Sequence, residues 1–333
     1  MAQVLNEIKP DAVAVPGWFF TDALSGLLWC LLKRRPMVLM SDSTFLDAPR
    51  TFWKEGIKKR LVGACSSALV AGVRQREYVT QLGMPADSIV LGYDVVDNCH
   101  FEQKAEGVRG RRSEDGGRFG LPEKYFLASA RFVEKKNLPR LIQAYARYRK
   151  LAEESEIGDR ISEIWKLVLL GDGPLRGELE RLISDLRLQS SVRLPGFKQY
   201  SDLPAYYGLA SAFIHASTTE QWGLVVNEAM ASGLPVLVSN RCGCAPDLVQ
   251  EGINGFTFDP YNVEQLAELM FKISAFQPVG LSAFGLASQR IISDWRPERF
   301  AQGLKAAAEK ALAVGPPKAN WFDRLLLRAL LLR

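Results

Sequence analysis

The sequence predicts an α/β protein with two Rossmann-like, doubly wound domains, of which the N-terminal one is incomplete. Short apolar segments alternate with amphipathic segments of helical period along nearly the whole chain, which is typical of parallel strands joined by crossover helices. The length of 333 residues allows two such domains, each with its own core. A charged, glycine-rich stretch at residues 102–121 separates the two series of strands, and we interpret it as a flexible linker.

The first domain is expected within residues 1–101. The apolar stretch at 18–32 is interrupted by Asp22 and is shorter than the roughly 20 residues that a membrane span needs, so we interpret it as a buried helix leading into a strand. With so few strands, one edge of the sheet is expected to be exposed. The predicted elements are helices at 22–32, 50–61 and 74–82, and strands at 37–40, 68–72 and 89–91.

The second domain, residues 122–292, alternates more regularly. A helix within 293–315 follows it and is expected to cross back to the N-terminal domain, and residues 316–333 form an amphipathic basic tail. Ligands of a doubly wound domain bind beyond the carboxyl ends of its strands. We predict strands at 125–130, 166–170, 192–194, 212–215, 235–239 and 255–258, and helices at 138–154, 175–186, 202–209, 224–232, 246–251 and 263–274.

The overall composition limits the classes of partner. Hydrophobic residues make up 47% and charged residues 24% of the chain, as in ordinary globular proteins. The formal net charge of +5 suits anionic ligands or a membrane surface but is too small to indicate a nucleic-acid partner. Five scattered cysteines do not make a disulfide framework, and no apolar run opens the chain as a signal peptide would. We expect a cytoplasmic protein, with weak contact at the inner face of a membrane.

Two glutamates flank a predicted strand–loop–helix junction. Glu220 lies in the loop after the strand at 212–215, and Glu228 lies in the second turn of the helix that follows. The free N–H groups at the start of that helix suit a diphosphate, and a carboxylate one turn later can accept both hydroxyls of a ribose. Spacing alone would fit an ordinary solvated helix face.

Two cations follow the first strand of the second domain. Arg131 and Lys136 lie between its carboxyl end and the next helix, where they could neutralise a leaving nucleoside diphosphate. Because Lys135 is equally charged, a solvated basic loop is the alternative interpretation.

Glycines mark two further strand ends. Gly171 and Gly173 lie in a Gly-Asp-Gly-Pro turn that opens a helix, which resembles a dinucleotide-binding turn but is weak evidence alone, since backbone shape could explain it. The acid expected to hold a ribose after the next strand is missing, because residues 192–199 contain no Asp or Glu. Gly196 and Phe197 end that strand, where the backbone could approach a planar base or simply form a turn.

Taken in order, these motifs resemble the retaining family 4 glycosyltransferases, which have the two-domain GT-B fold. The resemblance runs from Tyr125 to Phe271. Each motif alone is weak, whereas the ordered set is specific. It rests on Arg131 and Lys136, the turn from Gly171 to Pro174, Gly196, the pair Glu220 and Glu228, the stretch Ala229–Val236, and Asn254-Gly255.

The resemblance implies a role for each matching residue. Glu228 would hold the ribose, and Glu220 would contact the transferred sugar as a catalytic residue. The leaving diphosphate would be stabilised by Arg131 and Lys136 together with the backbone amides of Gly223, Leu224 and Val225.

The first domain departs from the family pattern. The family opens with a strand and a glycine-rich loop, and we find no such opening here. It often has a histidine facing the sugar after an early strand, where this chain has Asp42, so we assign Asp42 to that position as a second catalytic residue. His215, which ends a strand beside the donor loop, is interpreted as a packed or hydrogen-bonded residue rather than a catalyst. Cys242 and Cys244 replace a family glycine pair and, without further ligands nearby, are interpreted as small loop residues rather than a metal site.

Two stretches could lie in the plane of a membrane interface. Residues 50–60 are basic and contain aromatics, and residues 321–333 are rich in leucine and carry three arginines. The alternatives are a solvated face for the first stretch and a tail packed on the core for the second.

The function implied by the resemblance is a metal-independent hexosyltransferase that needs no cofactor. It would transfer a sugar from a nucleoside-diphosphate sugar to a glycan or lipid-linked acceptor with retention of configuration, in cell-surface polysaccharide or glycolipid biosynthesis. The absence of an Asp-x-Asp motif agrees with a metal-free reaction. The alternative is a catalytically impaired nucleotide-sugar binding module from a truncated transferase. A nicotinamide-dependent enzyme is disfavoured by the missing ribose acid.

Overall fold

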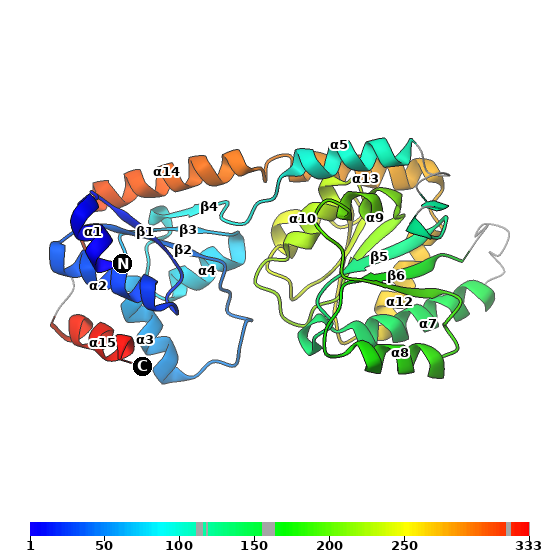
Figure 1. The fold of residues 1–333 in the computed structure, drawn as a ribbon, viewed down its shortest axis with the longest axis horizontal. Helices are drawn as coiled ribbons and strands as arrows, with labels where there is room; N and C mark the ends of the chain where they lie inside the picture. The colour runs from blue at the N-terminus through cyan, green and yellow to red at the C-terminus, as the bar shows by residue number, and fades with distance from the viewer. Residues whose placement is uncertain (111–115, 118, 155–163, 318–320, 333) are drawn as a thin grey trace. The chain divides into compact units, whose positions relative to one another are not determined.

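The structure, a computed structural model, describes residues 1–110, 116–117, 119–154, 164–317 and 321–332 (Figure 1). The chain divides into two compact units: unit 1 comprises Met1–Val95 and Pro297–Arg333, and unit 2 comprises Val96–Arg296. Each unit has its own parallel sheet with helices packed on it, so the predicted fold class of two Rossmann-like α/β domains is confirmed.

Unit 1 is built on a four-stranded parallel sheet in the order β1-β2-β3-β4. Leu39 and Val70 point to the face covered by the helices that join the strands, whereas Val38 and Leu69 point to the opposite face, where they pack with Ala307 of α14. In chain order the elements are α1 (Ala2–Ile8), β1 (Val13–Pro16), α2 (Thr21–Lys33), β2 (Met37–Ser41), α3 (Phe52–Gly63), β3 (Ser67–Val70), α4 (Val73–Gln81), η1 (Ala86–Ser88), β4 (Ile89–Leu91), α14 (Pro297–Val314) and α15 (Trp321–Leu331).

The expectation that unit 1 lacks an opening strand was wrong, whereas the segment after that strand contains a single glycine and no glycine-rich loop. β1 pairs in parallel with β2, and Gly17 follows it with a φ of 68° before α2 begins. The strand is short, ends in Pro16 and has one exposed face, so its sequence signal is weak. A proline is tolerated there because β1 is an edge strand.

Unit 2 is built on a six-stranded parallel sheet in the order β10-β9-β8-β5-β6-β7. The strand order reverses between β5 and β8, and in doubly wound sheets such a switch point is where ligands bind. Helix α13 was not predicted. The elements are α5 (Asn98–Arg109), β5 (Tyr125–Ser129), η2 (Glu134–Lys136), α7 (Leu138–Glu154), β6 (Lys166–Leu170), α8 (Arg176–Asp185), β7 (Val192–Gly196), α9 (Leu203–Leu209), β8 (Ala212–His215), α10 (Leu224–Ala231), β9 (Val236–Ser239), α11 (Ala245–Leu248), β10 (Gly255–Phe258), α12 (Val263–Ser274) and α13 (Pro278–Ile292).

The interpretation of residues 102–121 as a flexible linker was wrong for Glu102–Arg109, which belong to α5. Phe101 and Ala105, one helical turn apart, are fully buried, and α5 packs closely on α9 (Figure 1). A Cβ on Gly208 of α9 would lie 2.8 Å from the Cα of Ala105, so the two helices meet at backbone distance. Two apolar positions are enough to form one narrow buried face of a helix. Because the segment contains so few apolar residues, its sequence does not indicate a buried helix. Residues 111–115 and 118 of the predicted linker lie outside the described residues.

Both C-terminal helices belong to unit 1. α14 lies along β2, β3 and β4, and α15 packs on α2. In the described part of the chain, no single helix is long and apolar enough to cross a membrane, and one bent pair, Val263–Ser274 with Pro278–Val314, meets that test by length and composition only.

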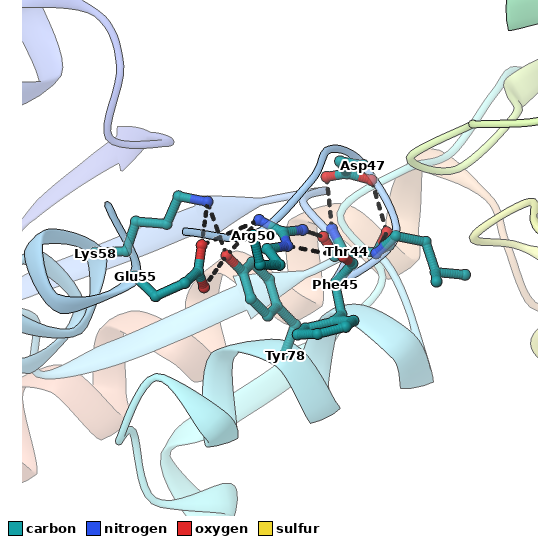
Figure 2. A network of polar contacts seen from close by, with 8 residues as sticks. Thr44, Phe45, Asp47, Arg50, Glu55, Lys58 and Tyr78 are labelled. Atoms are coloured by element: carbon teal, nitrogen blue, oxygen red, sulfur yellow. Dashed lines mark hydrogen bonds and ion pairs between the residues drawn. The ribbon is translucent and has the colours of Figure 1, made fainter. Parts of the chain in front are cut away.

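The loop between β2 and α3, which carries Asp42, is held by a network around Arg50 (Figure 2). The Arg50 guanidinium donates hydrogen bonds to the carbonyls of Thr44 and Phe45 and, at 2.8 Å, to the Tyr78 hydroxyl. It also lies 4.5 Å from the centre of the Tyr78 ring. The Tyr78 hydroxyl donates to Glu55 at 2.8 Å, and Lys58 donates to the same carboxylate at 2.9 Å.

The electrostatics of this network favour a charged Glu55. Burial alone would raise the pKa of Glu55, but hydrogen bonds from Lys58 and Tyr78 outweigh it and lower that pKa. Burial and the neighbouring Glu55 raise the pKa of Tyr78, so its hydroxyl stays protonated and can donate. The network therefore holds the backbone of this loop at Thr44 and Phe45.

An Arg50→Lys substitution is expected to destabilise unit 1 by about 1–2 kcal/mol, because lysine keeps the charge but loses the planar group that bonds two carbonyls and a hydroxyl together. Hydrogen–deuterium exchange of the amides at residues 42–50 should rise at the same time. The control is Arg35→Lys, whose partner Asp11 is 83% exposed and whose ion pair should contribute little. Equal stability and equal exchange in the two variants would contradict the role given to Arg50.

Candidate functional site

The loops that follow β5 and β8 are joined at the switch point of unit 2. The two strands are parallel neighbours, so their carboxyl ends lie side by side. The backbone N–H of Thr218 donates to the carbonyl of Lys135 (2.9 Å), and the side-chain amide of Asn137 donates to the carbonyl of Ala216 (3.1 Å). Asn137 is buried and has a φ of 58°, a left-handed conformation that asparagine adopts more readily than most residues. These bonds bring the basic loop and the acidic loop together.

Lys136 and Glu220, which are 84 residues apart in the sequence, form an ion pair at this junction. Each side chain is only 14% exposed. The carboxylate oxygen that contacts the Lys136 ammonium also accepts a hydrogen bond from the Ser217 hydroxyl (3.3 Å) and lies 3.2 Å from Nε2 of His215. One carboxylate oxygen of Glu220 therefore contacts a cation, a hydroxyl and an imidazole.

The charges in this cluster follow from burial and contact. Burial lowers the pKa of His215, although Glu220 opposes this shift, so the imidazole is mainly neutral near pH 7. Burial would raise the pKa of Glu220, but its contacts with His215 and Lys136 lower it well below the ordinary range. Glu220 is therefore ionised at neutral pH. Because His215 is mainly neutral, Lys136 is the residue that supplies the opposite charge. The prediction that His215 is a hydrogen-bonded strand end agrees with these contacts.

Glu228 lies in the second turn of α10, as predicted, and has a different environment. Its Oε2 accepts a hydrogen bond of 2.7 Å from the hydroxyl of Tyr207, which is fully buried on α9. Burial raises the pKa of Glu228 to about 7, against the opposing effect of the Tyr207 hydrogen bond. The carboxyl group is thus close to half-ionised at neutral pH, and a ligand that donates hydrogen bonds to it would favour the charged form.

The start of α10 lies against the Glu220 cluster. Gly223, its N-cap, has a φ of 107°, and a Cβ there would lie 3.4 Å from both Cγ of Glu220 and Nε2 of His215. The first amides of a helix, here those of Leu224 and Val225, have no acceptor within the helix and attract anions. A negatively charged group bound there would lie beside Lys136.

Gly171 and Gly173 allow two loops at the same edge of the sheet to pack closely. Both have positive φ, and a Cβ on Gly171 would lie 1.9 Å from the carbonyl oxygen of Ala130. A Cβ on Gly173 would lie 2.7 Å from the carbonyl oxygen of Phe132. The turn therefore packs directly under the loop that carries Arg131. The Arg131 side chain is exposed and forms no ion pair with any residue that the structure describes.

β7 ends at Gly196, two strands away from the switch point, and Phe197 follows it. Gly196 has a φ of 83° and open space where a Cβ would be, and Phe197 is 69% exposed. An exposed ring beside an open glycine suits stacking against a planar group. Asp42 belongs to unit 1 and follows the carboxyl end of β2, and its assignment as a catalytic residue stays a prediction.

The sequence reasoning missed three residues of the site: Tyr207, Ser217 and Asn137. Tyr207 lies in an apolar helix, where an aromatic residue normally indicates core packing. Ser217 and Asn137 follow His215 and Lys136 closely, so their position after strand ends is a signal. Only the folded structure shows that their side chains turn toward the cluster or brace its loops.

The two loop cysteines lie beside this site. Cys242 and Cys244 are fully buried free thiols. The backbone N–H of Gly243 donates to the Glu220 carbonyl (3.0 Å) and that of Cys244 donates to the Trp222 carbonyl (3.2 Å), so these two amides help to hold the Glu220 loop. Among the described residues, no group of three or more His, Cys, Asp or Glu is arranged to hold a metal ion.

Residues 113–276 match the model of the family described as glycosyl transferases group 1. Alpha-monoglucosyldiacylglycerol synthase of Streptococcus pneumoniae is 36% identical over 136 residues, which cover 41% of this chain and 28% of that protein. Sulfoquinovosyl transferase SQD2 of Arabidopsis thaliana is 38% identical over 109 residues, covering 32% of this chain and 20% of that protein. The chain thus spans less than a third of the length of these curated relatives.

Solved structures resemble the fold over nearly the whole chain. Anabaena Alr3699/HepE in complex with UDP has a TM-score of 0.72 at 21% identity, covering 92% of this chain and 80% of that one. Sucrose-phosphate synthase of Thermosynechococcus elongatus has a TM-score of 0.72 at 18% identity, covering 93% and 76%. At these identities the likeness establishes the two-domain GT-B architecture.

Proposed function

We propose that this chain, whose residues 113–276 carry a group 1 glycosyltransferase domain, transfers a sugar from a nucleoside-diphosphate sugar to a hydroxyl of a glycan or lipid-linked acceptor. The observation that carries the proposal is the cluster at the switch point, where Lys136, Glu220 and the first amides of α10 lie together. In the reaction the bond between the anomeric carbon and the diphosphate oxygen breaks and a bond to the acceptor oxygen forms. The nucleoside diphosphate leaves, and the proton of the acceptor hydroxyl passes to the departing diphosphate oxygen or to solvent.

The cluster suits the charge that develops on the leaving group. As the glycosidic bond breaks, negative charge grows on the diphosphate oxygens, and preorganised cations and amides stabilise it. Lys136 and Arg131 would supply positive charge, and the amides of Leu224 and Val225 would donate hydrogen bonds. Because Lys136 pairs with Glu220 in the structure, the ammonium would be shared between the diphosphate and that carboxylate when the donor binds.

The nucleoside would be held by the remaining predicted residues. The free oxygen of Glu228 would accept from the ribose hydroxyls, with Tyr207 fixing the other oxygen. Phe197 and the open backbone at Gly196 would contact the base. We propose UDP as the first nucleotide to try, since HepE of Anabaena, which resembles this fold, was solved with UDP and with UDP-glucose.

The finer features of the reaction are part of the same proposal. We propose retention of configuration, no metal requirement, and a place in cell-surface polysaccharide or glycolipid synthesis. The names of relatives such as the Streptococcus pneumoniae synthase support a lipid acceptor. All five cysteines are free thiols, which suits a reducing cytoplasm.

The experiment that tests this function is donor binding followed by product analysis. Calorimetry with UDP and with GDP on the full chain should give micromolar binding for one of them. The matching sugar nucleotides are then incubated with diacylglycerol and with glycan acceptors, and the anomeric proton of the product is examined by NMR in the presence of EDTA. A product with the donor's anomeric configuration is expected.

The outcomes separate the alternatives. Binding without transfer to any acceptor would favour a nucleotide-sugar binding module. An inverted product would contradict retention, and loss of activity with EDTA would contradict metal independence. Absence of binding to both nucleotides would overturn the assignment of the donor site.

A further inference from the structure

The C-terminal helix α15 is apolar on two opposite faces. On the inner face, Leu327 is 1% exposed, and Leu330 and Leu331 pack against the core of unit 1. On the outer face, Trp321 is 74% exposed and Leu325 is 54% exposed, and one helical turn separates them. A surface helix normally keeps its outer face polar, so packing within the described chain does not explain this stripe.

The outer stripe continues to the end of the helix and is bordered by positive charge. Leu332, the residue after the end of α15, is 89% exposed and follows Leu325 by seven residues, which is two helical turns. Arg324 and Arg328 are both exposed and lie along one margin of the stripe. This arrangement, an apolar centre with cations at its margin, suits a partner with an apolar interior and an anionic surface.

Helix α3 extends this surface. Arg60 of α3 forms an ion pair with Asp323 in the first turn of α15 (3.0 Å), and its guanidinium lies 4.8 Å from the centre of the Phe322 ring. At the other end of α3, Phe52 is 97% exposed and Trp53 is 55% exposed. Aromatic side chains with this exposure are costly in water and are typical of the boundary between lipid headgroups and acyl chains.

The balance of charge over the two helices is positive. The acidic residues are already engaged: Asp323 pairs with Arg60, and Glu55 lies within the network around Tyr78. The exposed cations that remain beside the Arg60–Asp323 pair are Lys54, Lys59, Arg324 and Arg328. Each cation near an anionic bilayer adds attraction, and an apolar face of Trp, Phe and Leu adds burial in the interface.

We propose that α3 and the outer face of α15 form a docking surface, the α3/α15 surface, for an anionic lipid bilayer. Trp321, Leu325 and Leu332 enter the boundary of headgroups and acyl chains, while Arg324 and Arg328 contact the lipid phosphates. This inference goes beyond the transfer reaction, because docking requires neither donor nor acceptor. If both hold, unit 1 is anchored where a lipid-linked acceptor is found.

The test is flotation of the full chain with vesicles of phosphatidylcholine alone and with vesicles that also contain phosphatidylglycerol. Binding to the anionic vesicles and weak binding to the neutral ones are expected. An Arg324→Gln/Arg328→Gln variant should bind anionic vesicles about 30-fold more weakly, since each cation near the surface contributes about fivefold. A Trp321→Ser/Leu325→Ser variant should lose binding to a similar or greater extent.

The control is a Val279→Ser/Leu286→Ser variant, which changes exposed apolar residues of unit 2 (82% and 66% exposed) and should bind as the unchanged chain does. Unchanged UDP binding and melting temperature show that each variant is folded, and they keep this test separate from that of the transfer reaction. The proposal is overturned if the unchanged chain does not bind anionic vesicles or if the α15 variants bind equally well. It is also overturned if the α15 variants abolish a dimer in solution, because a second copy would then be the occupant.

Discussion

A Lys136→Met substitution is expected to lower the rate of sugar transfer by about 100- to 1000-fold, the usual effect of removing one group that stabilises developing negative charge. Methionine keeps much of the length and apolar contact of lysine but removes the ammonium that contacts Glu220. Since no charge then remains to stabilise the leaving diphosphate from this position, the loss should fall mainly on kcat.

The matched control is Lys135→Met. Lys135 is the preceding residue and has the same charge, but its side chain is exposed, and only its carbonyl is bonded to the loop that carries Glu220. Steady-state kinetics of the two variants should therefore differ by at least tenfold in kcat. Equal losses would mean that only the net charge of the loop matters, and the contact of Lys136 with Glu220 would have no catalytic consequence.

Removal of the ammonium should also change the ionisation of Glu220. In the unchanged chain the contacts with His215 and Lys136 hold the pKa of Glu220 well below its ordinary range. Such a carboxylate stabilises the folded state at neutral pH, and this contribution is lost as the pH falls through the lowered pKa. The Lys136→Met variant should lose that stabilisation at a higher pH, which acid titration of the folded state would measure.

A Glu228→Gln substitution is expected to weaken UDP binding by about 30- to 100-fold, because hydrogen bonds from ribose hydroxyls to a carboxylate are stronger than those to an amide. Glutamine has nearly the same volume, so packing around Tyr207 should persist. Calorimetry would measure the loss, with Glu268→Gln, an exposed glutamate of α12, as the control. Unchanged affinity in the Glu228→Gln variant would remove Glu228 from the donor site.

The pH dependence gives this prediction a second, independent readout. Burial raises the pKa of Glu228 to about 7, so UDP affinity in the unchanged chain should fall as the pH drops below 7. The stability of the protein without UDP should have the opposite dependence on pH. Because the folded state holds this proton more tightly than the unfolded chain, the contribution of Glu228 to stability is present at low pH and is lost as the pH rises through about 7. Both dependences should disappear in Glu228→Gln.

Much of the second unit was predictable because its motifs follow the order of the strands. Apolar runs of strand length, each followed by glycine or charge, define the carboxyl edge of a parallel sheet. In such a sheet that edge is where ligands bind, so Lys136, Glu220 and Glu228 could be named from their positions after strands and at a helix start. Their proposed roles stay predictions.

Elements with few apolar residues were not predictable in the same way. β1 is four residues long with one exposed face, and α5 buries only one narrow face in a charged stretch, so neither has a strong periodic signal. Both form because a neighbouring element covers them: β2 pairs with β1, and α9 packs on α5.

The sequence alone determined the fold class, the edge of the sheet that is proposed to carry the chemistry and the residue types found there, because these depend on local periodicity and on position after strands. Only the tertiary structure decided the partners. Lys136 meets Glu220 because β5 and β8 are adjacent across the reversal of strand order. Tyr207 meets Glu228 because α9 and α10 both pack on α5. Distances between residues far apart in the sequence are set by packing, and the opposite ionisation of the two glutamates follows from these contacts.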